Sequence, residues 1–164
     1  MKNIIIGNII GLFASLILVY SSIPKTKKKI LYFQTTSIGL SVISNAVLGG
    51  ISGAIINIIN LIRNILCYKN KLNIIGKTII TLASTTLILK FNNLKLIGLL
   101  PLISSVSYVW LMDIKDVKKF KLLFAFTMTL WLIYDLTIKA YTSAIFDIIT
   151  ITMNLLTITK TEDK

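Results

Sequence analysis

The chain has 164 residues, of which 55% are hydrophobic and 15% are charged, and its mean hydropathy is +0.83. Soluble domains carry roughly 25% charged residues, so a water-soluble fold would lack the polar side chains needed to cover its surface. Histidine is absent and Cys67 is the one cysteine. That excludes an internal disulfide and the usual histidine-based catalytic and metal sites. We therefore expect no enzyme and no bound cofactor or metal. The net charge of +12 does not indicate nucleic-acid binding, because the lysines lack interleaved aromatic residues.

The lysines instead lie between apolar blocks, each near the ~20 residues needed to cross a bilayer as a helix. In chain order, the first block ends before Pro24, Gly49-Gly50 separates the second from the third, and Asn70 and Asn92-Asn93 bound the fourth. Connections this short make successive helices antiparallel neighbours. The sequence predicts an all-α membrane protein with seven transmembrane helices at 4–23, 30–48, 51–67, 72–89, 96–112, 120–138 and 141–158.

The distribution of basic residues predicts the orientation, because cytoplasmic loops carry an excess of lysine and arginine. Four of these residues fall on one side: Lys2, Lys90, Lys95 and Lys139. Thirteen fall on the other side: Lys25, Lys27, Lys28, Lys29, Arg63, Lys69, Lys71, Lys115, Lys118, Lys119, Lys121, Lys160 and Lys164. We expect a multi-pass protein of the bacterial inner membrane, with its N-terminus outside and its C-terminus in the cytoplasm. A cleaved signal peptide is disfavoured, because Lys2 is alone while four lysines follow the first apolar block.

Shifting the sequence by 90 positions brings the third and seventh helices into register. Gly53 to Ile59 then meets Ser143 to Ile149, so that Asn57 meets Asp147. The same shift brings Asn45 to Asp135 and Asn64 to Asn154. A three-helix unit followed by one extra helix repeats in the same orientation, which predicts a 3+1+3 arrangement about an axis along the membrane normal. The expected parts are a first bundle at 1–69, a linker helix at 70–93, and a second bundle with a short cytoplasmic tail at 94–164.

Several motifs resemble those of the YgjV-type bacterial inner-membrane proteins. They are Val47 to Asn57 running into Leu61 to Asn64, Leu99-Leu100-Pro101, Trp131 to Asp135, Ala144 to Asp147, and Asn154. This resemblance covers nearly the whole chain and implies a topology, but no reaction. The 3+1+3 plan is also similar to that of the SWEET and PQ-loop transporters, which hold a solute between two parallel triplets. The Pro-Gln pair of those transporters is absent, since Lys25 follows Pro24 and Gln34 is ten residues away.

Polar residues within the apolar blocks are candidate site residues, because charged groups at mid-membrane usually face a cavity or a partner. Asn57, Asn60 and Asn64 share one helix face by their spacing. Asp147, Thr150 and Asn154 form a matching stripe in the seventh helix, and Trp131 lies mid-span in the sixth. These seven residues are the predicted substrate-binding set. The alternative is that the Asn and Thr side chains only join helices.

Four further residues are interpreted separately. Asp135 and Lys139 lie four apart, which favours an interfacial ion pair. Arg63 lies near the inner end of the third helix, which favours an extension of its side chain to lipid phosphates. Pro101 in the fifth helix would free a backbone carbonyl and allow a hinge.

Together these patterns predict a transporter or facilitator for a small polar solute, bound between the two three-helix units. The alternative is a receptor or assembly partner that transports nothing. The expected partners are the lipid bilayer and a small polar solute, and no oligomer is required to complete the pocket.

Overall fold

The computed structural model describes residues 2–159, and in this part of the chain every regular element is a helix. The predicted cytoplasmic tail, residues 160–164, lies outside the described residues. The helices are α1 (Lys2–Tyr20), α2 (Lys27–Val47), α3 (Ile51–Tyr68), α4 (Ile74–Phe91), the short 3₁₀ helix η1 (Ile97–Leu99), α5 (Leu100–Leu111), α6 (Val117–Thr137) and α7 (Tyr141–Thr159).

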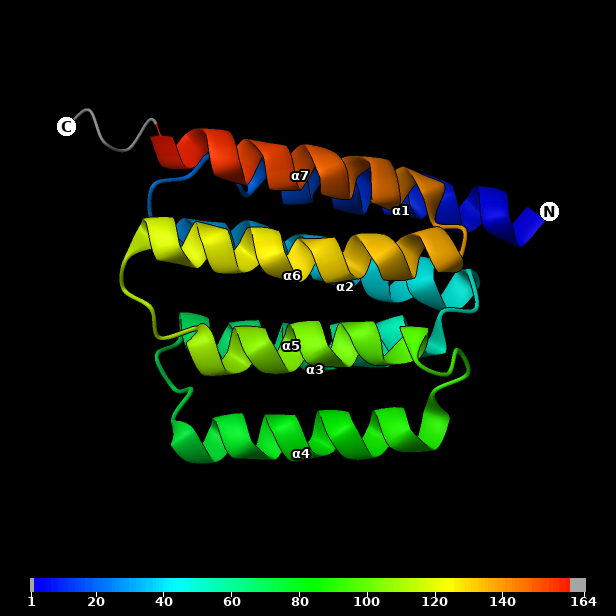
Figure 1. Ribbon diagram of the computed structural model, residues 1–164, viewed down its shortest axis with the longest axis horizontal. Coiled ribbons are helices and arrows are strands. Elements are labelled where there is room, and N and C mark those ends of the chain that lie inside the picture. Colours follow the sequence, from blue (N-terminus) through cyan, green and yellow to red (C-terminus); the bar gives the residue numbers. More distant parts are fainter. Residues whose placement is uncertain (1, 160–164) are drawn as a thin grey trace.

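The helices lie side by side in two layers (Figure 1). One layer has the order α1, α2, α3 and the other has the order α7, α6, α5. Helix α1 packs on α7, and α3 packs on α5, while α4 covers the edge formed by α3 and α5. The backbones of the middle helices, α2 and α6, approach each other less closely than these pairs do. The odd-numbered helices run in one direction and the even-numbered helices in the other (Figure 1).

Six of the helices are long and apolar enough to cross a membrane, namely α1, α2, α3, α4, α6 and α7. The seventh apolar segment, Ile97–Leu111, is shorter because it divides into η1 and α5. Fifteen residues in these two forms span about 24 Å, less than the ~30 Å of hydrocarbon. The prediction of one continuous helix over 96–112 is therefore wrong at its start. Pro101 lies in the first turn of α5. The backbone N–H groups of a first turn have no intrahelical partner, so proline loses no hydrogen bond there.

Apolar side chains cover the outside of the bundle and polar side chains fill much of its interior. Ile5 and Leu89, for example, are 60% and 73% exposed, whereas Asn64 and Thr150 are fully buried. This distribution is the reverse of the one that water favours. It is the distribution expected when lipid surrounds the helices and polar groups find partners inside.

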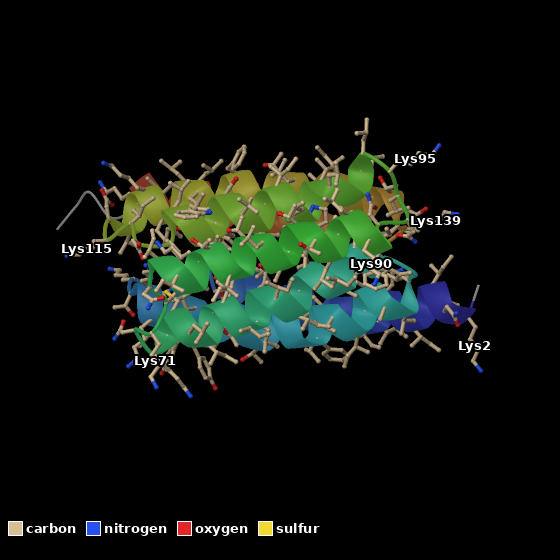
Figure 2. The ribbon with its side chains drawn as sticks, turned by 90° about the horizontal axis from the view of Figure 1, so that it is seen from below. Lys2, Lys71, Lys90, Lys95, Lys115 and Lys139 are labelled. Atoms are coloured by element: carbon tan, nitrogen blue, oxygen red, sulfur yellow. The ribbon has the colours of Figure 1, made fainter. Side chains whose placement is uncertain are left out.

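Basic residues mark the two ends of the bundle. The lysine-poor end holds the start of α1 and the loops after α2, α4 and α6; the lysine-rich end holds the loops after α1, α3 and α5. Figure 2 shows Lys2, Lys90, Lys95 and Lys139 at the former, and Lys71 and Lys115 at the latter.

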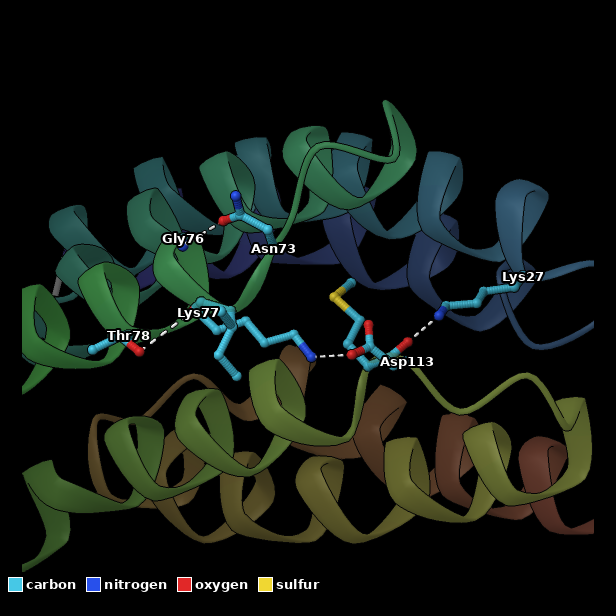
Figure 3. A network of polar contacts seen from close by, with 8 residues as sticks. Lys27, Asn73, Gly76, Lys77, Thr78 and Asp113 are labelled. Atoms are coloured by element: carbon cyan, nitrogen blue, oxygen red, sulfur yellow. Dashed lines mark hydrogen bonds and ion pairs between the residues drawn. The ribbon is translucent and has the colours of Figure 1, made fainter.

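A cluster of polar contacts closes the bundle at the lysine-rich end (Figure 3). Buried Lys77 near the start of α4 forms an ion pair with Asp113 in the loop after α5. Lys27 at the start of α2 donates to the backbone carbonyl of Met112. The side chain of Asn73 caps α4 by accepting from the Gly76 amide at 2.8 Å. These contacts tie α2, α4 and α5 together where the helices end.

Candidate solute-binding cavity

A cavity of about 80 Å³ lies between the two layers. Its walls come from α1, α2 and α3 on one side and α5, α6 and α7 on the other. The lining residues are Ser15, Leu18, Gln34, Ser37, Ile38, Ser41, Ser44, Asn45, Asn57, Asn60, Arg63, Ser104, Tyr108, Phe124, Thr127, Met128, Trp131, Asp135, Ser143 and Asp147.

Fourteen of the lining residues form seven pairs whose members are 90 positions apart in the sequence. Each pair contributes one residue from either layer. The pairs are Leu18 with Tyr108, Gln34 with Phe124, Ser37 with Thr127, Ile38 with Met128, Ser41 with Trp131, Asn45 with Asp135, and Asn57 with Asp147. Residues at equivalent positions of two similar segments therefore face one common space.

Arg63 supplies the positive charge at the part of the cavity nearer the lysine-rich end. Its side chain is 4% exposed. Nη1 donates to Oδ1 of Asn60 at 2.8 Å, and Nε and Nη2 donate to Oδ1 of Asn64 at 3.0 and 2.8 Å. The guanidinium carbon also lies 4.4 Å from the centroid of the Tyr108 ring. Helix geometry brings Asn60 to Arg63, because residues three apart on α3 lie on the same face.

Two further hydrogen bonds extend this network to other helices. Ser105 of α5 donates to Oδ1 of Asn60 at 2.6 Å, and the hydroxyl of Tyr108 donates to Oε1 of Gln34 at 2.8 Å. The network therefore joins α3 to α5 and α5 to α2 across the two layers. It holds the guanidinium in one place with neutral partners only.

Two carboxyl groups lie nearer the lysine-poor end. Asp135 is close to the end of α6, and Asp147 is in the second turn of α7. Their exposed fractions are 6% and 3%. Oδ1 of Asp135 and Oδ2 of Asp147 have no hydrogen-bond partner among the described residues. Asp147 and Asn57, which are 90 positions apart in the sequence, both lie six residues after the start of their helices, so they line the cavity at one depth.

The predicted site residues fall into two groups. Asn57, Asn60, Trp131 and Asp147 line the cavity. The remaining three are buried behind the lining. Asn64 holds Arg63, while Asn154 donates to the hydroxyl of Ser22 at 2.9 Å and so joins α7 to the chain after α1. Thr150 follows Asp147 by three residues and lies on the same face of α7. Its hydroxyl oxygen has no hydrogen-bond partner among the described residues.

Two interpretations from the sequence are wrong. Asp135 and Lys139 form no ion pair: within residues 2–159 the one such pair is Lys77 with Asp113. Helix α6 ends at Thr137, and Lys139 adopts a φ of 62° in the following turn. The helical i, i+4 relationship is therefore lost. Arg63 does not extend to lipid phosphates either, because the Asn60 and Asn64 oxygens and the Tyr108 ring hold it inside.

Sequence reasoning also missed the contribution of α2. Gln34, Ser37, Ser41 and Asn45 all line the cavity. Serine in an apolar helix carries little information, since its hydroxyl can bond to the backbone of a neighbouring turn or helix. Ser37, for instance, donates to the Ala14 carbonyl at 2.8 Å. The shift of 90 positions was the available signal, because it pairs Asn45 with Asp135.

Apolar helices that lie side by side around a polar interior define a polytopic helical membrane protein. The model of the Imp-YgjV family, described as a bacterial inner membrane protein, matches residues 5–164. The chain belongs to this family, which confirms the resemblance found in the sequence. No curated protein and no solved structure gave a match.

Proposed function

We propose that this protein is a transporter or facilitator that moves a small polar solute across the bacterial inner membrane, without catalysing a chemical reaction on it. The solute binds in the cavity between two three-helix units, residues 1–69 and 94–164, and α4 in residues 70–93 links them. The two units run parallel to each other and form a SWEET-like 3+1+3 repeat. Alternating access then results from a rocking of one unit against the other.

The single observation that carries this proposal is that three buried ionisable side chains line one cavity. A charged side chain at mid-membrane costs about 2.5–3.5 kcal/mol on insertion scales. Arg63, Asp135 and Asp147 are all buried, all line the same cavity, and are not paired with one another. A purely structural interface would place such groups in contact or replace them with apolar residues.

The seven residue pairs 90 positions apart support the repeat, because a solute site on a pseudo-twofold axis is lined by equivalent residues of both units. The lysine distribution supports an orientation with the N-terminus outside and the C-terminus inside. In that orientation Arg63 faces the cytoplasmic half of the membrane, and Asp135 and Asp147 face the outer half.

The test is counterflow in liposomes that contain the purified protein. Each liposome preparation is loaded with one unlabelled polar metabolite, and uptake of the labelled compound from outside is measured. We expect at least one small polar solute to accumulate, and Asp147→Asn and Asn57→Ala to reduce its initial rate by about tenfold or more. Asp116→Asn, at the exposed N-cap of α6 and outside the cavity, is the matched carboxylate control.

The alternative is a receptor or assembly partner on the same fold. It predicts solute binding without counterflow, or stable capture of one partner protein. Unchanged uptake in both cavity variants, for every solute that the protein carries, would contradict transport through this cavity.

A further inference from the structure

Three of the buried polar side chains that lack a hydrogen-bond partner line the cavity, namely Gln34, Asp135 and Asp147. Five unpaired atoms are found among the described residues: Nε2 of Gln34, Nδ2 of Asn64, Oδ1 of Asp135, Oδ2 of Asp147 and Oγ1 of Thr150. A buried polar atom left unpaired costs roughly 1–3 kcal/mol. A native structure that keeps several of them in one region therefore indicates a bound group that would satisfy them.

These atoms separate by chemical type along the membrane axis. Gln34 offers an N–H donor to the cavity and lies toward the lysine-rich end, as does Arg63, whereas the unpaired N–H of Asn64 lies behind the lining. Asp135 and Asp147 offer acceptor oxygens and lie toward the lysine-poor end. Donors gather at one end of the site and acceptors at the other, so the unsatisfied groups define a direction.

The charges have the same polarity. A guanidinium has five N–H donors, and the three hydrogen bonds of Arg63 to Asn60 and Asn64 leave two free for a ligand. All three acceptors in those bonds are neutral amide oxygens, so the positive charge of Arg63 has no counter-ion within the described chain. The two carboxyl groups likewise have no cationic partner there.

We propose that the cavity binds a small zwitterion. Its anionic group, a carboxylate, faces Arg63 and Gln34, and its ammonium group faces Asp135 and Asp147. This assignment rests on the proposed role of the cavity as a solute site and names the class of solute. A carboxylate fits the planar, two-pronged donor geometry of a guanidinium, and an ammonium group supplies three donors to unpaired carboxyl oxygens.

The depth of the charged groups limits the length of the ligand. Asp147 is level with Asn57, and Arg63 is six residues further along α3, about 9 Å by the helical rise. The guanidinium bends back toward Asn60, three residues nearer to Asp147, which reduces the axial separation to about 5 Å. A linear amino acid of two to four carbons spans that distance.

Calorimetric titration of the purified protein in nanodiscs tests the assignment. The zwitterions are glycine, β-alanine and 4-aminobutanoate; the singly charged analogues are butylamine and butanoate; butanamide is the neutral analogue. We expect at least one zwitterion to bind about tenfold or more tightly than either singly charged analogue. Equal affinity for butanamide, or no binding by any zwitterion, would overturn the proposal.

Single substitutions then test the direction of binding. Arg63→Gln should weaken butanoate about tenfold or more and spare butylamine, whereas Asp147→Asn should do the reverse. Lys95→Gln and Asp116→Asn, the latter at the exposed N-cap of α6, are controls outside the cavity and should change neither. Asp147→Asn preserves the side-chain shape. If Arg63→Gln does not fold, the loss of butylamine affinity in Asp147→Asn, with butanoate affinity retained, still decides the test. Parallel losses for both analogues in either variant would contradict the two-ended site.

The binding and transport results separate the two proposals. Zwitterion binding without counterflow supports the site and contradicts transport. Counterflow of a neutral solute, with no zwitterion bound, supports transport and contradicts the zwitterion site.

Discussion

The guanidinium of Arg63 stacks over the ring of Tyr108, with the guanidinium carbon 4.4 Å from the ring centroid. Arg63 belongs to α3 in one layer and Tyr108 to α5 in the other. The tyrosine hydroxyl also donates to Gln34 of α2 at 2.8 Å. One aromatic residue therefore contacts two helices of the opposite layer and positions the only arginine of the chain. A cation–π contact removed from water is worth about 2 kcal/mol.

Substitutions of Tyr108 should separate the roles of its ring and its hydroxyl. Tyr108→Phe removes one hydrogen bond and should lower the free energy of unfolding by about 1 kcal/mol. Tyr108→Leu also removes the contact with Arg63 and the packing against Phe120 and Phe124, and should cost about 3 kcal/mol or more. Unfolding by sodium dodecyl sulfate in mixed micelles measures both values. Tyr141→Leu, at an exposed tyrosine, should change the value by less than about 0.5 kcal/mol. Equal losses in the two Tyr108 variants would show that the ring contact with Arg63 contributes nothing.

Asn60 should matter more for stability than its size suggests. Its Oδ1 accepts from Nη1 of Arg63 at 2.8 Å and from Oγ of Ser105 at 2.6 Å. Asn60→Ala leaves a buried charged donor without a partner and should cost about 2–3 kcal/mol, against about 1 kcal/mol for Ser105→Ala.

The same unfolding assay on the double variant Asn60→Ala/Ser105→Ala tests this linkage. We expect it to be no less stable than Asn60→Ala alone, because the bond from Ser105 ends on the deleted side chain. Fully additive losses would mean that Ser105 acts through another contact.

The sequence predicted the helices well, but it indicated only some of the residues that line the cavity. In lipid, backbone hydrogen bonds must be satisfied within each segment, so blocks of apolar residues suffice to locate helices such as α2 and α7. The division of the fifth segment was missed, because Pro101 was interpreted as an interior residue and not as the start of α5. Spacing along one helix is local information, and it correctly grouped Asn57 with Asn60.

The missed site residues depend on contacts between helices, which one sequence does not display. Arg63 turns inward because Tyr108, which is 45 residues away, offers it a ring. Asp135 does not pair with Lys139, because α6 ends two residues after Asp135. Only the shift of 90 positions carried such long-range information, through the pair of Asn45 with Asp135.

Gly53 should resist replacement although it lies inside a helix. Alanine normally stabilises a helix interior by about 1 kcal/mol relative to glycine. A Cβ on Gly53, however, would lie 2.7 Å from Nδ2 of Asn45 and 2.7 Å from Cε1 of Tyr134. The Gly53 amide also donates to the Tyr134 hydroxyl at 2.8 Å. We expect Gly53→Ala to lower the thermal midpoint of the detergent-solubilised protein.

Gly39 is the matched control for this substitution. A Cβ there would meet only Cδ1 of Leu61 at 3.6 Å, an ordinary contact distance. Gly39→Ala should leave the thermal midpoint unchanged or raise it. A rise in both variants would mean that α3 and α6 are farther apart than the described contacts require.

The proposed repeat predicts that Asn57 and Asp147 can be exchanged. Both lie six residues after the start of their helices and line the same cavity. Asp147→Asn alone removes a carboxyl group and should weaken the binding of butylamine about tenfold or more. The double variant Asn57→Asp/Asp147→Asn restores a carboxyl group at the same depth and should recover most of that affinity. Calorimetric titration measures both, and an equal loss in the single and double variants would contradict the pseudo-twofold relationship.

The proposed orientation predicts which lysine positions are accessible from outside the cell. After Cys67→Ser removes the native thiol, single cysteines are introduced at Lys95, Lys139, Lys71 and Lys115. Figure 2 shows the first two at the lysine-poor end and the last two at the lysine-rich end. In intact spheroplasts, a membrane-impermeant maleimide should label Lys95→Cys and Lys139→Cys, while Lys71→Cys and Lys115→Cys should react only after permeabilisation. The pair Lys95 and Lys115 also tests whether the short segment of η1 and α5 crosses the bilayer, because the two positions lie on either side of it. Labelling of both from outside would show that it does not cross, and would remove the basis for two parallel three-helix units.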